Sequence, residues 1–363
     1  MENRESMGNN EMLMLHRMPS PESYPDTAET RCPTLLAEWL RLNPNAVATK
    51  RDHEDWAEPA AIMVAMARRG EVTMLVSAGG QRTCGDRTAA PRARPGSPRA
   101  IMWGVFTDSD AREMPVDVDL AWSAKHEATL VQDYAHSPVF LERAGRPFHV
   151  CDMDREQISA ALQSIVDGGA DRGFVKTRDK ALSYAFSLKD DGRTNMSGEP
   201  VSLFARMDGE DQDFSYSLMH RESDRACIYV QGAFSPTCEY RVIVVGDRVA
   251  CGAACIEAHT PAESEGMFFD DRMEVVRGSG EIVRMPDLAD RYKEFAKEYA
   301  AAWTAEHGAG CGYSLDLSID AETSRIVPIE MNPLLNLGLY ANDADMIVDA
   351  MLGPVEHKPA LAA

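Results

Sequence analysis

The alternation of apolar and polar residues predicts secondary structure most clearly in the second half of the chain. Apolar residues recur at helical spacing over 155–167 and 286–305, and the second segment opens with Pro286, a residue favoured in a first helical turn. Runs of β-branched and aromatic residues predict strands at 173–177, 226–231, 239–245 and 248–258. We expect a helix followed by a strand, and then an antiparallel meander.

The pattern is weaker in the first half. It predicts short helices at 35–42 and 60–69 and strands at 73–77 and 101–106. Between these strands, residues 78–100 are rich in Gly, Pro and Arg, which predicts a flexible loop. No motif in this half indicates a chemical function.

The predicted organisation is a domain preceded by a smaller lobe. The lobe is of unclear type and covers 1–77 and, beyond the loop, 101–145; the domain covers 146–353, and a tail follows at 354–363. The mixture of helices with hairpin-forming strands predicts an α+β fold. The length of 363 residues and a hydrophobic content of 44% are sufficient for a substantial core.

Charge and cysteine content narrow the possible functions. The formal net charge of -21 argues against a protein that coats nucleic acid, although a local cluster of basic residues and metal could still bind a small anion. The polar, acidic first thirty residues do not resemble a signal peptide, and no run is long enough to span a membrane. Eight scattered cysteines favour reduced thiols, so we expect a soluble cytoplasmic protein without a membrane partner.

The segment GYSLDLSIDAETSRIVPIEMNP carries the clearest chemical signal. It predicts two strands joined by a turn at 320–324. Odd positions are apolar and would pack on the core, whereas even positions bring carboxylates and an amide to the other face. The residues at the even positions are Ser314, Asp316, Ser318, Pro328, Glu330 and Asn332. Such a set of hard oxygen ligands suits magnesium, which completes its coordination with water and phosphate oxygens.

Two interpretations of this face are open. The polar residues could decorate a solvated side of the hairpin, which is common in antiparallel sheets. The apolar LLNLGLY that follows favours instead the wall of a closed cleft. A second possible metal site, formed by Cys227, Cys238, Cys251 and Cys255, lacks a paired C-x-x-C, and buried core thiols explain these residues better.

IVPIEMNP resembles the closing motif of the ATP-grasp superfamily, a strand ending in Glu, one residue, Asn and Pro. The resemblance implies that Glu330, Asn332 and the upstream Asp316 hold magnesium on ATP. FVKT resembles the strand with a phosphate-contacting lysine, here Lys176, and Lys180 resembles the second lysine of a phage-associated clade. The resemblance also implies two lobes of antiparallel sheet that clamp the nucleotide.

Two further segments match in the same order. IYVQG resembles the linker that contacts adenine through its main chain, which implicates Tyr229, Val230 and Gln231. CEYRVIVVGDRV resembles a stretch in which Glu239 lies in the cofactor site and Arg241 faces the transferred phosphate. The expected glycine-rich phosphate loop is not evident, and the best candidate is DDGRTNMSGEP, at 190–200.

By this resemblance, the chain is an ATP- and Mg²⁺-dependent ligase that joins a small-molecule or peptide carboxylate to an amine, with Arg241 and Lys176 as catalytic residues. Two alternatives keep the same fold: a nucleotide-binding pseudoenzyme and an ATP-dependent phosphotransferase. A structural protein without nucleotide binding is a further alternative. The identities of the acid and amine, and the oligomeric state, do not follow from the sequence.

Overall fold

The computed structural model describes residues 13–17, 23–69, 72–77, 80–83, 99–103, 119–122, 133–152, 154–177, 183–189, 192–199, 201–205, 227–308, 312–334 and 337–352. Contacts divide the chain into two compact units. Unit 1 contains residues 1–131, 238–317 and 330–363, and unit 2 contains residues 132–237 and 318–329. The candidate magnesium residues belong to unit 1, and Lys176 belongs to unit 2.

The N-terminal half forms a mainly parallel sheet with the order β5-β4-β1-β6-β7. Its strands are β1 (Leu13–Arg17), β4 (Val72–Ser77), β5 (Gly80–Thr83), β6 (Arg99–Trp103) and β7 (Asp119–Trp122). β1 is parallel to β4 and β6, and only β5 is antiparallel to its neighbour. The predicted loop at 78–100 therefore contains β5 and the start of β6, because a strand such as GQRT is held by backbone pairing rather than by an apolar pattern.

Three helices and a short two-stranded sheet accompany this sheet. They are β2 (Ser23–Pro25), α1 (Ala28–Arg31), α2 (Pro33–Leu42), β3 (Val47–Thr49) and α3 (Glu54–Arg68). Trp39 of α2 and Trp56 of α3 are fully buried and meet edge to face, with ring centroids 5.5 Å apart. The contact packs the start of α3 against α2. The sequence predicts this helix only from residue 60 onward, whereas in the structure it begins at Glu54.

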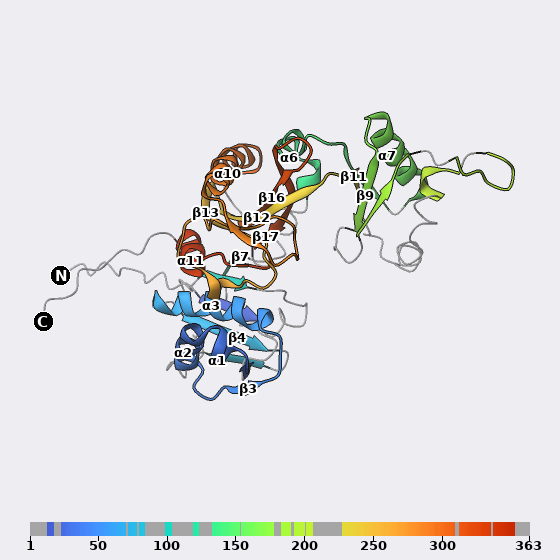
Figure 1. Ribbon diagram of the computed structural model, residues 1–363. Coiled ribbons are helices and arrows are strands. Elements are labelled where there is room, and N and C mark those ends of the chain that lie inside the picture. Colours follow the sequence, from blue (N-terminus) through green and yellow to red (C-terminus); the bar gives the residue numbers. More distant parts are fainter. Residues whose placement is uncertain are drawn as a thin grey trace, which may run out of the picture. The chain divides into compact units, whose positions relative to one another are not determined.

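A second sheet in unit 1 carries most of the candidate site and has the order β13-β12-β16-β17. Its strands are β12 (Pro236–Val245), β13 (Arg248–Ala254), β16 (Gly312–Asp320) and β17 (Ile326–Pro333). The helix α10 (Pro286–His307) lies beside these strands in Figure 1 and contacts β13. The Tyr292 hydroxyl of this helix donates to the Cys238 carbonyl oxygen of β12 at 2.6 Å.

The N-terminal half and the C-terminal helix share one hydrophobic core with this sheet. Ile62 of α3 packs in the same cluster as Ile243 of β12 and Val348 of α11 (Ala344–Leu352). Arg68 of α3 also forms an ion pair with Asp345. Residues from the N-terminal half therefore lie against the strands that carry the candidate site.

The small hairpin of β14 (Arg272–Glu274) and β15 (Ile282–Arg284) completes the strands of unit 1, and the 3₁₀ helix η2 (Pro261–Glu263) precedes it. Cys238, Cys251 and Cys255 are all buried and reduced. Their environment is that of core thiols, as expected from the apolar runs in which they lie. In the parts of the chain that the structure describes, we find no helix long and apolar enough to cross a bilayer.

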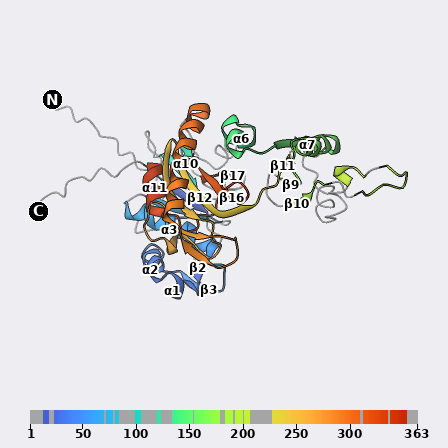
Figure 2. The same cartoon turned by 45° about the horizontal axis from the view of Figure 1, so that its top comes forward.

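Unit 2 is built on an antiparallel sheet of order β10-β9-β11-β8. Its strands are β8 (Phe148–Asp152), β9 (Arg172–Thr177), β10 (Ser183–Ser187) and β11 (Cys227–Gly232). The helix α7 (Arg155–Asp167) contacts β8 and β11, and Figure 2 shows it beside the strands of this sheet. The Asp154 side chain caps its first turn by accepting from Gln157 N. Two short helices precede β8, η1 (Asp133–His136) and α6 (Pro138–Ala144).

The α+β prediction is confirmed, but the predicted meander is wrong in one respect. β12 and β13 form the expected antiparallel hairpin around Gly246, whose φ is 64°. β11 instead pairs with β8 and β9 in the other sheet. The residues between Gly232 and Pro236 carry the chain from one sheet into the other without a reversing turn. In the candidate phosphate loop, the Asn195 side chain accepts from Ser197 N and Glu199 N, and this forms a local turn.

Candidate functional site

The even positions of the β16–β17 hairpin share one buried face. Ser314 and Ser318 are fully buried, and Asp316 and Asn332 are each 5% exposed. The odd positions Tyr313, Leu315 and Leu317 are also fully buried, which confirms the predicted apolar face. Asp316 and Asn332 are thus buried, whereas Glu330 is partly exposed, so the interpretation of a solvated polar face is wrong for Asp316 and Asn332.

The Asn332 side-chain nitrogen lies where three oxygen acceptors converge. It donates to Ser314 Oγ at 3.3 Å, to Asp316 Oδ2 at 3.1 Å and to Glu330 Oε1 at 3.3 Å. Burying two carboxylates this close together is costly unless positive charge or donors compensate. The hydroxyl and the two carboxylates supply hard oxygen atoms of the kind that magnesium prefers, and Asn332 would add its Oδ1 with its amide turned, since its nitrogen faces the acceptors here. The residues present fit this ion.

Arg241 is the main cationic partner of this cluster. Its Nε and Nη2 donate to the two oxygens of Asp316 at 2.7 and 2.6 Å, and its Nη1 donates to the Gly338 carbonyl oxygen at 2.6 Å. Burial lowers the pKa of the guanidinium, but Asp316 outweighs this effect and holds the pKa well above its ordinary value. Arg241 therefore orients the Asp316 carboxylate as a bidentate partner.

A second arginine lies at the edge of the cluster. Arg277 Nη1 donates to Glu239 Oε2 at 3.0 Å, and the Arg277 side chain remains 48% exposed. Burial raises the pKa of Glu239, Arg277 lowers it, and Asp316 and Glu330 raise it further, with a net increase. Glu239 is thus close enough to interact with the acidic cluster, and it accepts a hydrogen bond from Arg277.

Unit 2 brings three of the predicted nucleotide residues together on one face of its sheet. Tyr229 lies opposite Lys176 in the β11–β9 register, and Lys176 Nζ is 5.7 Å from the Tyr229 ring centroid. Gln231, two residues further along β11, accepts from Arg146 Nε at 2.9 Å. Val230 points to the opposite face and is fully buried in the core under α7, so it could contact a ligand only through its main chain. Lys180 lies outside the described residues.

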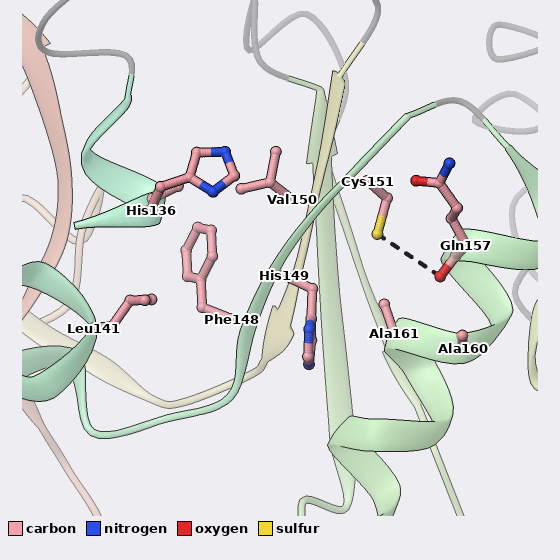
Figure 3. Close-up of a pocket in the computed structure, with 10 residues that line it drawn as sticks. His136, Leu141, Phe148, His149, Val150, Cys151, Gln157, Ala160 and Ala161 are labelled. Carbon is pink, nitrogen blue, oxygen red and sulfur yellow. Dashed lines mark hydrogen bonds between the residues drawn. The ribbon is translucent and has the colours of Figure 1, made fainter. Parts of the chain in front are cut away.

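A pocket of about 590 Å³ lies along β8 in unit 2, lined by residues of β8, the preceding 3₁₀ turn and helix, and α7. Figure 3 shows Phe148 and His136 on one side of the strand and His149 and Cys151 toward α7, with Cys151 Sγ donating to Gln157 O at 3.8 Å. None of the predicted site residues lines it. The volume alone therefore does not identify a ligand site.

Comparison with known proteins gives similarity at the level of structure only. Neither a protein-family model nor a curated protein sequence matches this chain. The chain is similar to D-alanyl-alanine synthetase A from Vibrio cholerae, with 12% identity over 94% of this chain and 97% of the other at a TM-score of 0.44. It is also similar to a RimK domain ATP-grasp protein from Sphaerobacter thermophilus, with 15% identity, coverage of 94% and 100%, and a TM-score of 0.42. A third is D-cycloserine synthetase DcsG, with 12% identity, coverage of 93% and 98%, and a TM-score of 0.46.

The residues that the sequence motifs single out form two groups, one in each unit. Asp316, Glu330 and Asn332 join with Arg241 in unit 1, and Lys176 joins with Tyr229 and Gln231 in unit 2. Within the described residues, no group of three or more His, Cys, Asp and Glu side chains is placed to hold a metal. The cluster in unit 1 instead combines two carboxylates with an amide.

Sequence reasoning missed three residues at the unit 1 cluster. Arg277 and Tyr340 lie beside it, and the Arg241 guanidinium carbon is 5.0 Å from the Tyr340 ring centroid. Glu58 comes from α3, in the half of the chain without a motif, and accepts from Leu339 N at 2.5 Å. Only the positive φ of 50° at Tyr340 marks this segment as unusual, and that is a property of the structure rather than of the sequence.

Proposed function

We propose that this chain binds ATP with magnesium and acts as a carboxylate–amine ligase. The observation that supports this most is the convergence of oxygens of the buried Ser314 and Asp316 and of the partly buried Glu330 on Asn332. A buried acidic cluster of this kind is destabilising in itself, and a function that requires a cation explains why it is present.

In this proposal, Asp316, Glu330 and Asn332 would hold magnesium. Arg241 keeps the Asp316 carboxylate in one orientation, because both carboxylate oxygens are engaged by the guanidinium. A carboxylate has about four acceptor positions, so hydrogen bonds from Arg241 and Asn332 still leave room for a metal. This assigns Arg241 a positioning role toward Asp316 in addition to the phosphate-facing role that the motif implies.

In unit 2, Lys176 would neutralise phosphate oxygens, with Lys180 as a second cation, and the main chain of Tyr229, Val230 and Gln231 would contact adenine. When bound, ATP would phosphorylate a carboxylate, and an amine would displace the phosphate to give an amide, ADP and inorganic phosphate. The cationic side chains would stabilise the charge that develops in this transfer.

Turnover distinguishes the ligase from the other functions of the same fold. We would incubate the protein with Mg-ATP, a panel of carboxylic acids and hydroxylamine as a general amine, and measure ADP and hydroxamate. A ligase gives equal amounts of both, and Glu330→Gln should give neither. ADP with a stable phosphorylated acid and no hydroxamate would indicate a phosphotransferase, whereas ATP binding without ADP release across the panel would favour a pseudoenzyme.

A further inference from the structure

A carboxylate from the N-terminal half reaches the segment that follows the β17 strand. Glu58 lies on α3 and is partly buried, and its Oε1 accepts from Leu339 N at 2.5 Å. The amide of Tyr340, the next residue, acts with that of Leu339 to lower the pKa of this carboxyl against the effect of burial.

This contact continues into the acidic cluster through hydrogen bonds. A Cβ atom placed on Gly338 would lie 3.6 Å from Glu58 Oε1 and 3.5 Å from Arg241 Nη1, so both side chains flank this residue. The Gly338 carbonyl oxygen accepts from Arg241, which in turn binds Asp316. These contacts therefore link α3 to the candidate magnesium ligands.

Helix α3 is a firm support for this arrangement. Arg68 donates to both oxygens of Glu38 at 2.8 and 2.7 Å, and it also pairs with Asp345 of α11. Ile62 and Met66 are fully buried against the β12–β13 hairpin and α11. A displacement of Glu58 would require this packing to change.

We propose that Glu58 is a positioning residue of the candidate magnesium site: it fixes the Gly338–Tyr340 segment and, through the Gly338 carbonyl, the Arg241–Asp316 pair. This inference rests on the proposed function, since it concerns the same cluster. It also assigns a role to the N-terminal half of the chain, in which the sequence shows no motif.

The charge of Glu58 gives this role a measurable signature. The groups that face it are Arg241 from β12, the amides of Leu339 and Tyr340, and Glu54 from its own helix. Ionised Glu58 competes with Asp316 for the positive charge of Arg241, so Asp316 keeps more of its own negative charge for a cation. Cation affinity should therefore rise as Glu58 ionises.

The test uses Mn²⁺ as a magnetic substitute for Mg²⁺, titrated into the full chain and followed by electron paramagnetic resonance at about pH 6 and pH 8. We expect the Mn²⁺ dissociation constant of the wild type to fall by roughly tenfold over this range. Glu58→Gln should remove most of that change, and Glu58→Ala should also weaken binding at the higher pH. Asp55→Asn, which removes an exposed carboxyl from the same helix, should behave as the wild type.

The outcomes separate this inference from the proposed function. If Glu330→Gln abolishes Mn²⁺ binding but Glu58→Gln keeps the wild-type affinity and pH profile, the positioning role is wrong and the site stands. If the wild type binds no Mn²⁺, or Glu330→Gln binds it equally well, the proposed metal site fails and the role of Glu58 fails with it. Near-ultraviolet circular dichroism of each variant shows that an altered affinity does not come from unfolding.

Discussion

Replacing Arg241 with methionine is expected to lower the free energy of unfolding by about 3–5 kcal/mol, because it leaves the Asp316 carboxylate buried without its charged partner. Asp316 is 5% exposed and receives two hydrogen bonds from this arginine. The segment at Gly338 would also lose the donor that holds its carbonyl oxygen.

Urea denaturation followed by tryptophan fluorescence measures this effect in the relevant part of the chain, because all five tryptophans belong to unit 1. Arg277→Met is the matched control. It removes an arginine that also pairs with a carboxylate, but the side chain is 48% exposed, so the loss should stay below about 1 kcal/mol. A second substitution, Asp316→Leu in the Arg241→Met background, should recover part of the stability. Equal losses for Arg241→Met and Arg277→Met would show that the buried pair is not the stabilising element.

The second large effect is a loss of stability as pH rises toward neutrality, caused by Glu58. Burial raises the pKa of this carboxyl to about 7, although the amide of Leu339 and the charge of Arg241 act in the opposite direction. The ordinary pKa of a glutamate is 4.5, so between that pH and about 7 the folded protein binds a proton that the unfolded chain has released. The stabilisation is complete below about pH 4.5 and is lost as pH rises through about 7.

The difference of about 2.5 pKa units corresponds to roughly 3 kcal/mol at most. Many carboxyl groups titrate in the same range, so the informative quantity is the stability of Glu58→Gln relative to the wild type. The two proteins should be similar near pH 4.5, and the variant should become the more stable one as pH rises to about 8. Urea titrations at several pH values give this difference, and a constant difference would show that Glu58 ionises normally.

The grouping of polar side chains on the β16–β17 hairpin could be predicted because strand alternation is a local property. Side chains two residues apart point the same way, so the sequence alone places Asp316 with Ser314 and Glu330 with Asn332. The start of α10 at Pro286 and the Gly246 turn are equally local, and both are confirmed. Hydrogen bonds of Asn332 to residues of both strands then support the shared face.

What the sequence could not show depends on contacts between distant segments. Arg241 and Asp316 are 75 residues apart, and Glu58 and Leu339 are 281 apart, so no spacing rule connects them. The register of polar strands such as β5 follows from backbone pairing, which leaves little trace in an apolar pattern. β11 likewise lies in a different sheet from β12 because it pairs with β8 and β9, and the sequence does not show which strands pair.

Calorimetric titration of ATP into the wild type and into Glu330→Ala, each in the presence and in the absence of magnesium, tests the central claim most directly. We predict binding by the wild type that requires magnesium and that Glu330→Ala weakens by at least about a hundredfold, since it removes a ligand of the ion. Glu322→Ala, which removes an exposed carboxylate from the turn of the same hairpin, should bind as the wild type. A folded wild type that binds no nucleotide, or a Glu330→Ala variant that binds it equally well, would contradict the assignment of this hairpin as a nucleotide and magnesium site.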